Sequence, residues 1–212
     1  MRFQRTFLAL SLLAAAGLSK ADIFILAGPG NFDNDENVLF NVDGLQDNGN
    51  PVQGITNVTG FIVDFLGTED LTTPSGGQAR VEAMDGSFNN LAIFLDDPDA
   101  GYTSLILNIN AEEDGLVDFD ITGLDGSHFL QSFSLDGGGE NFFRIFSTDD
   151  DFITNSFFAT NVGVQDIRQI RIGGSTTEFP PEGEPLPEPA TVGFACAAVG
   201  MAFLRRTKKR AS

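Results

Sequence analysis

The stretch GLVDFDITGLDGSHFLQSFSL, residues 115–135, carries the pattern that decides the fold class. Its first part places Val117, Phe119 and Ile121 at alternate positions, with an aspartate between each pair. A period of two residues is that of a β-strand with one buried face. A turn signal, Asp-Gly at 125–126, follows, and then a second apolar run. The stretch therefore predicts two strands on either side of a tight turn.

Short apolar runs of the same kind recur along the chain, and no segment shows the stripe of an amphipathic helix. Turn signals such as Asp43-Gly44 lie between the runs. The sequence predicts an all-β domain over residues 22–173, an antiparallel β-sandwich that is jelly-roll-like and has no crossover helices. The other expected strands cover residues 38–42, 61–65, 79–84, 91–95, 105–109, 142–146, 153–158 and 167–172.

Charge is distributed unevenly along the chain. All 30 acidic residues lie between Asp22 and Glu188, a stretch with only four of the 12 cations. Four positive charges against 30 negative ones leave a net charge of −26 there. Such a surface repels phosphate backbones, so we expect no nucleic-acid binding. The four cations are Arg80, Arg144, Arg168 and Arg171. Arg168 and Arg171 are expected to pair with neighbouring acids or, alternatively, to form a recognition spot.

The first 21 residues, MRFQRTFLALSLLAAAGLSKA, combine a basic start with an apolar run at 6–17. That run is too short to span a membrane and has the length of the apolar region of a signal peptide. Small side chains at the end of the segment favour cleavage between Ala21 and Asp22. We therefore expect export and processing by signal peptidase.

The C-terminal segment, residues 187–212, has three parts in a fixed order, and a Pro- and Glu-rich linker at 174–186 precedes it. A Pro-Glu-Pro triplet comes first, then an apolar run at 190–204, then a basic tail. The positive-inside rule keeps such a tail in the cytoplasm. The order therefore predicts a hydrophobic helix that holds the chain in the membrane with the acidic domain outside. The triplet is Pro187, Glu188 and Pro189, and the tail contains Arg205, Arg206, Lys208, Lys209 and Arg210.

This order of parts resembles the PEP-CTERM sorting signal of Gram-negative bacteria. The resemblance implies that exosortase, a membrane cysteine protease, recognises the triplet in an inner-membrane intermediate. It also implies that the helix is then removed. The mature protein would be released or attached at the cell surface or in the extracellular matrix, in association with exopolysaccharide.

Aspartate and asparagine cluster in loops, where their oxygens are the ligands that calcium prefers. The candidate calcium ligands are Asp33, Asp35 and Asn37 in one loop and Asp96, Asp97 and Asp99 in another. The first loop begins like an EF-hand, but Val38 and Gly44 stand where that motif needs glycine and glutamate. Both loops are open to two interpretations, a calcium site or solvated Asx-turns. No other cofactor is expected.

No catalytic residue is predicted. The only histidine, His128, follows Ser127, and adjacent residues of a strand point to opposite faces, so the two form no dyad. The only cysteine, Cys196, lies in the apolar C-terminal segment, which leaves no disulfide. The sequence favours a non-enzymatic envelope or matrix protein. The alternatives are a carbohydrate- or calcium-binding adhesion module and, less favoured, a secreted glycoside hydrolase.

Overall fold

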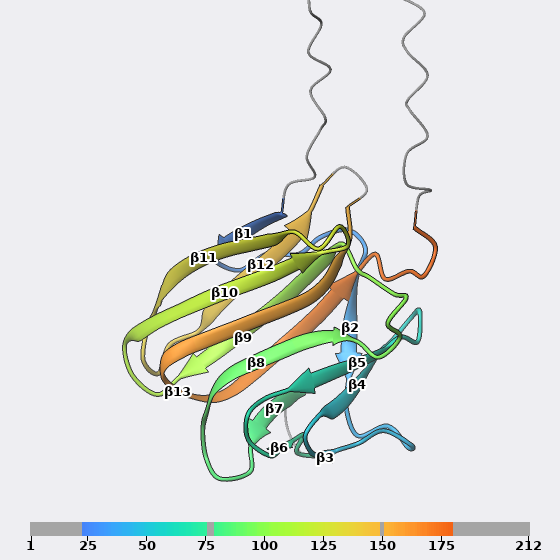
Figure 1. Cartoon of the computed structure of the whole chain (residues 1–212). Coiled ribbons are helices and arrows are strands. Elements are labelled where there is room, and N and C mark those ends of the chain that lie inside the picture. Colours follow the sequence, from blue (N-terminus) through green and yellow to red (C-terminus); the bar gives the residue numbers. More distant parts are fainter. Residues whose placement is uncertain (1–22, 76–78, 149–150, 180–212) are drawn as a thin grey trace, which may run out of the picture. The chain divides into compact units, whose positions relative to one another are not determined.

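The computed structural model describes residues 23–75, 79–148 and 151–179, and these residues form thirteen strands and no helix (Figure 1). The predicted all-β class is confirmed. The expected signal segment and C-terminal hydrophobic helix lie outside the described residues, which themselves contain no membrane-spanning helix. The strands are β1 (Ile23–Ala27), β2 (Asp35–Leu39), β3 (Asn48–Gly49), β4 (Val52–Thr56), β5 (Ile62–Leu66), β6 (Leu71–Thr72), β7 (Arg80–Ala83), β8 (Phe88–Leu95), β9 (Ser104–Ala111), β10 (Gly115–Gly123), β11 (His128–Leu135), β12 (Asn141–Ser147) and β13 (Ile153–Gly173).

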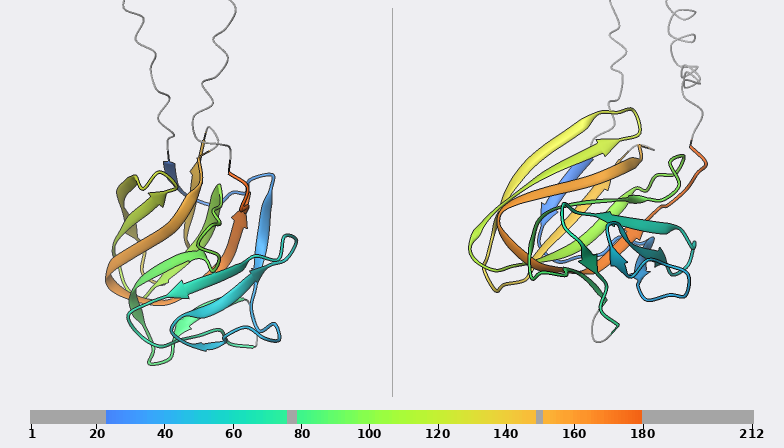
Figure 2. Two further views of the ribbon diagram at one scale, coloured as in Figure 1. Left: turned by 45° about the vertical axis from the view of Figure 1, so that its right-hand side comes forward. Right: turned by 60° about the horizontal axis from the view of Figure 1, so that its bottom comes forward.

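The last strand, β13, is long and bent, and it takes part in both layers of the domain (Figure 2). Its first part pairs with β10 and β8, and its second part pairs with β9, β7 and β2. The two strands expected at 153–158 and 167–172 are therefore one continuous strand, because the chain bends between them without leaving the sheet.

The pairings join all the described strands into one antiparallel sheet that folds over on itself. Layer A contains β11, β10, the first part of β13, β8, β5 and β4. Layer B contains β1, β12, β9, the second part of β13, β7 and β2. Strand β2 also pairs with β4 and so connects the layers a second time. The jelly-roll-like connectivity stays a prediction.

The core lies between the two layers and is built from the inward-facing residues of each strand. Val117, Phe119 and Ile121 of β10 are all buried, as their alternation predicts. The Phe119 ring contacts Phe143 of layer B at a centroid distance of 4.9 Å and Phe158 of β13 at 6.0 Å. Aromatic contacts across the layers therefore hold them face to face.

Strand β9 departs from the predicted alternation, because both of its faces are buried. Leu105, Leu107 and Ile109 face the core as expected. Ile106 and Asn108 face the other way, yet they are only 3% and 1% exposed. The outer face of layer B is therefore covered over β9.

The start of β1 and the end of β13 lie at one end of the domain, with β12 and β9 between them (Figure 1). Ile23 pairs with Ser147, whose backbone N–H donates to the carbonyl of Thr103. The N–H of Thr103 donates in turn to the carbonyl of Gly173, the last residue of β13. The first residue of β1 and the last residue of β13 therefore lie at the same end of the domain.

Phe119→Ala should lower the free energy of unfolding by about 3–5 kcal/mol, because it opens a cavity where the aromatic rings of both layers meet. Urea unfolding measures this effect. The control is Leu130→Ala, whose side chain is 71% exposed. It should change stability by less than about 0.5 kcal/mol. Equal effects of the two substitutions would contradict this account of the core.

Candidate functional site

The strongest concentration of polar and cationic side chains lies on the outer face of layer B. Arg144 of β12 pairs with Ile106 of β9, which in turn pairs with Arg171 of β13. Residues directly opposite each other in a sheet point to the same side. Because Ile106 faces away from the core, both arginines lie on the outer face of layer B.

A second row runs beside the first, across β12, β9, β13 and β7. Phe142 pairs with Asn108, Asn108 with Arg168, and Arg168 with Arg80. The second row therefore adds two more arginines to the same face. We call this surface the arginine face and define it by Arg80, Phe142, Arg144, Ile106, Asn108, Arg168 and Arg171. It carries all four cations found between Asp22 and Glu188.

Two of these arginines are neutralised by acids of the same strands. Arg168 Nε donates to Asp166 Oδ1 at 2.8 Å, and Nη2 of the same guanidinium lies 3.3 Å from Oδ2. Arg80 forms an ion pair with Glu82. The expected pairing of Arg168 with a neighbouring acid is confirmed. Arg171, in contrast, donates from Nη1 to the side-chain carbonyl of Asn31 at 2.5 Å.

The loop of residues 28–32 lies over one part of the arginine face. The N–H of Gly28 donates to the carbonyl of Phe142 at 2.8 Å, and the Phe32 ring packs against Phe146 at 5.1 Å. Gly30 rests on the guanidinium of Arg144, where a Cβ would come within 2.5 Å of Nη1. A larger residue at this position would displace the Arg144 guanidinium from its place under the loop.

A pocket of about 220 Å³ opens between this loop and the strands beneath it. It is lined by Pro29, Gly30, Asn31, Ile106, Phe142, Gln169 and Arg171. The side chain of Asn108 is buried beside it, next to Phe142. Neither Asn108 Nδ2 nor Asn108 Oδ1 has a hydrogen-bond partner among the described residues, and neither does Arg144 Nε. The pocket thus combines an aromatic ring, a guanidinium and an amide with nearby unsatisfied donors.

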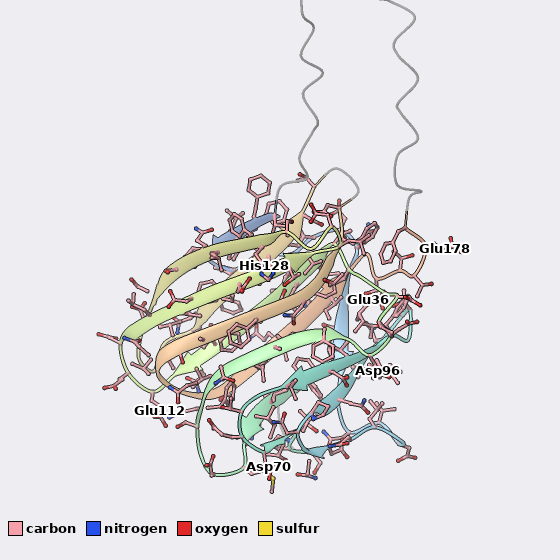
Figure 3. All side chains as sticks on the ribbon, in the orientation of Figure 1. Glu36, Asp70, Asp96, Glu112, His128 and Glu178 are labelled. Atoms are coloured by element: carbon pink, nitrogen blue, oxygen red, sulfur yellow. The ribbon has the colours of Figure 1, made fainter. Side chains whose placement is uncertain are left out.

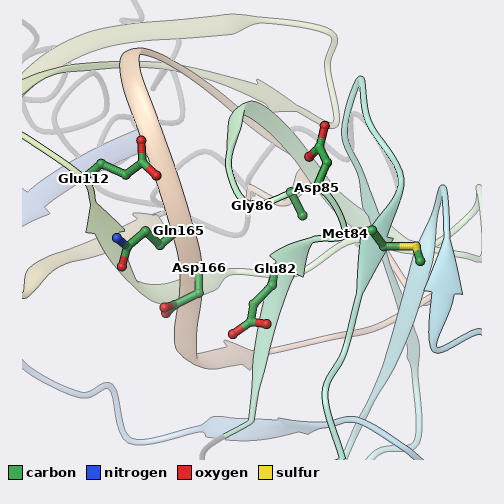
Figure 4. Close-up of a pocket in the computed structure, with 8 residues that line it drawn as sticks. Glu82, Met84, Asp85, Gly86, Glu112, Gln165 and Asp166 are labelled. Carbon is green, nitrogen blue, oxygen red and sulfur yellow. The ribbon is translucent and has the colours of Figure 1, made fainter.

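A second hollow, of about 480 Å³, lies beside the arginine face and is lined by acids (Figure 4). Glu82 of β7, Asp166 of β13 and Glu112, which follows β9, contribute carboxylates to it. Two of these carboxylates are already paired with arginines, and Asp166 also accepts from Asn110 Nδ2 at 2.9 Å. These contacts account for Glu82 and Asp166 as partners of arginines.

The first candidate calcium loop is occupied by hydrogen bonds within the protein. Asp35 accepts from the backbone N–H of Phe32 at 2.5 Å and from Ser104 Oγ at 2.8 Å. Asn37 lies in β2 opposite Arg171, and Asp33 lies on an exposed turn. In the part of the chain that the structure describes, no hydrogen bond joins these three candidates to one another. The Asp35 side chain instead holds the loop through its bonds to Phe32 and Ser104.

The second candidate loop follows β8 (Figure 3). Asp97 Oδ1 accepts from the N–H of Asp99 at 2.9 Å, which is an Asx-turn. Asp96 lies apart from that turn, beside Asp64 of β5. Across residues 23–75, 79–148 and 151–179, no three His, Cys, Asp or Glu side chains gather as a metal site. Calcium binding by these loops stays a prediction.

The other candidate residues divide between the domain and the ends of the chain. His128 begins β11 and its Nδ1 lies 2.7 Å from Asp120 Oδ1 on an exposed surface (Figure 3), which agrees with the expected strand-end position. The cleavage pair, the Pro-Glu-Pro triplet, Cys196 and the basic tail lie outside the described residues. Sequence reasoning noted all four arginines but did not place them on one face.

Asp64 is the one acid of β5 and is buried on the side of layer A that faces away from the core. Its Oδ1 accepts from Gln53 Nε2 at 2.9 Å. Burial raises the pKa of the Asp64 carboxyl above its usual value, and the nearby Asp96 carboxylate raises it further, while the Gln53 hydrogen bond opposes both effects. The Asp64 carboxylate is therefore unfavourably placed when charged.

No protein-family model matches the chain, and no curated protein does either. Among solved structures, it is similar to the family 11 carbohydrate-binding module of the cellulosomal cellulase Lic26A-Cel5E of Clostridium thermocellum. The identity is 13% and the TM-score 0.31, over 66% of this chain and 94% of that one. It is also similar to CBM29_1, a family 29 carbohydrate-binding module from Piromyces equi, with 15% identity and a TM-score of 0.28 over 74% and 91% of the two chains.

Asp64→Asn should stabilise the domain at pH 7 by on the order of 1 kcal/mol, because the amide keeps a hydrogen bond to Gln53 and removes a buried charge. A raised pKa means that the folded chain binds this proton more tightly than the unfolded chain. The stabilisation from protonated Asp64 is therefore present below pH 3.8 and is lost as the pH rises through the raised pKa.

Unfolding by urea between pH 3 and pH 8 measures this difference. The gain from Asp64→Asn should be largest at neutral pH and should vanish in acid. Asp33→Asn removes one charge from an exposed turn and serves as the control for net charge. A gain of the same size in both variants would show that overall repulsion, rather than burial of Asp64, is responsible.

Proposed function

We propose that this protein is exported and sorted by exosortase, and that its β domain binds a glycan of the cell surface or extracellular matrix without catalysis. The binding site is the pocket between the 28–32 loop and the arginine face. The observation that carries the proposal is the grouping of every arginine of an acidic domain on one face, beside an aromatic pocket.

The chemistry of the pocket suits a sugar. A sugar ring presents hydroxyl groups at its edge and an apolar C–H surface on its face. Phe142 offers a flat apolar surface for the ring face, whereas Arg171 and Gln169 offer polar groups for the hydroxyls. A small number of fixed polar groups in an apolar pocket is the usual composition of a ligand site.

The position of the chain ends supports a tethered binding module. Ile23 and Gly173, at the start of β1 and the end of β13, lie at the same end of the domain, where Ser147 and Thr103 connect them. A sorting segment after β13 would therefore hold the domain by that end. The pocket beneath the 28–32 loop would then be presented by a domain held at a single point.

Phe142→Ala should weaken glycan binding about tenfold, because it removes the apolar surface of the pocket. Affinity gel electrophoresis of the purified protein in a panel of neutral and acidic polysaccharides measures the effect. Phe157→Ala, a substitution in the layer A part of β13, is the matched control and should leave affinity unchanged. Loss of binding in both variants, or in neither, would contradict the assignment of the pocket.

Glu188→Ala should block processing of the C-terminal segment, so that the full-length chain accumulates in the inner-membrane fraction. Cell fractionation with immunoblotting measures this outcome. Glu184→Ala removes a carboxylate from the linker and is the matched control, for which normal maturation is expected. Unchanged maturation of the Glu188 variant would remove the role given to the triplet.

A further inference from the structure

Two of the four arginines on the arginine face lack an acidic partner. Among the described residues, the arginine ion pairs are Arg80 with Glu82 and Arg168 with Asp166. Arg144 and Arg171 form no ion pair in that part of the chain, although the domain contains far more acids than cations. In a domain of this composition, a cation that has no acid beside it is the exception.

The two unpaired guanidinium groups converge on the same loop. Arg171 Nη1 donates to Asn31 Oδ1, and Gly30, the preceding residue, rests on the guanidinium of Arg144. On the sheet beneath, Arg144 and Arg171 are separated only by Ile106. Two strand spacings, about 10 Å, separate their backbones, and their guanidinium groups reach adjacent residues of the loop.

The guanidinium of Arg144 has a buried donor that the described residues do not satisfy. Its Nε is buried and unpartnered among the described residues, and the Asn108 amide nearby is in the same condition. Burying a cation without a counter-charge or hydrogen bonds is costly. Guanidinium groups bind carboxylates through paired, charge-assisted hydrogen bonds, which Arg geometry favours. A carboxylate at this position would satisfy donors that the protein leaves open.

The net charge of the domain limits which anions can bind in the pocket. The −26 charge of the Asp22–Glu188 stretch opposes a densely charged polymer such as a nucleic acid. At physiological ionic strength, however, charges beyond about 8 Å are largely screened, so the local pair of arginines decides what binds in the pocket. A carbohydrate with a carboxylate on individual sugar rings has a lower charge density than a nucleic acid, and it still offers an anion to the two arginines.

We propose that the pocket beneath the 28–32 loop binds the carboxylate of a hexuronic acid residue within an acidic polysaccharide. Arg171, which lines the pocket, and Arg144, which lies beside it beneath Gly30, hold this group. The proposal rests on the glycan-binding function proposed above and names its substrate class. Phe142 supports the sugar ring, and Asn108 lies within the same cluster of open donors.

The test compares acidic polymers with their own methyl esters, because esterification removes the charge and keeps the backbone. Polygalacturonate, alginate and polyglucuronate are titrated into the purified protein by calorimetry, each beside its methyl ester, and neutral dextran is included. We expect at least one acidic polymer to bind, and its ester to bind about tenfold more weakly.

Arg144→Gln and Arg171→Gln should each weaken binding of that acidic polymer about tenfold, and Arg171→Lys, which keeps the charge and loses the paired donors, should fall between. Ser134→Asp makes the same change of net charge on β11, in the other layer, and should alter affinity less than about twofold. Urea unfolding confirms that each variant is folded.

The outcomes separate the two proposals. Equal binding of acid and ester, or full binding by both arginine-to-glutamine variants, would overturn the carboxylate assignment. If a neutral polymer binds and Phe142→Ala abolishes that binding, glycan recognition stands and the hexuronic acid assignment falls. Binding of none of the polymers would count against the glycan-binding function itself.

Discussion

The hydrogen bonds that one strand, β13, makes in two layers are the constraint on which the rest of the domain depends. Its first part forms ladders with β10 and β8, and its second part with β9, β7 and β2, so five strands take their position from it. Gly163 lies where the register of β13 against β8 shifts, and a Cβ there would lie 2.3 Å from Glu112 Oε2. A larger residue would displace the Glu112 side chain.

A bulge in the same strand assembles the candidate site. Arg168 and Arg171 are three positions apart, and in a regular strand they would point to opposite faces. Their partners on β9, Asn108 and Ile106, are only two positions apart, so β13 contains an extra residue between them. Gln169 takes up that irregularity with a positive φ of 56°. The bulge therefore places both arginines outward and lets the strand bury Ile167 and Ile172 on its inner side.

These features separate what the sequence predicts from what it does not. The alternation in β10 depends on one strand with one buried face, so the sequence predicted its core residues correctly. The sequence did not predict β4, because Gly54 interrupts its apolar pattern. Glycine stands there because the backbone lies in close contact with Val38, and not because of its β-propensity. The arginine face depends on registers between strands far apart in the chain and on a bulge. Neither leaves a periodic trace in the sequence, and the sorting residues lie outside the described part.

The segregation of charge gives the domain two electrostatic properties that operate at different distances. Acids spread over the stretch from Asp22 to Glu188 keep its net charge strongly negative, which opposes aggregation and the binding of dense polyanions. On the arginine face itself, Glu82 and Asp166 are paired with Arg80 and Arg168. Those two ion pairs thus leave Arg144 and Arg171 as the unneutralised charges of the face. Recognition at this pocket therefore depends on two guanidinium groups and the loop that covers them. The net charge of the domain does not determine the sign of the charge that the pocket binds.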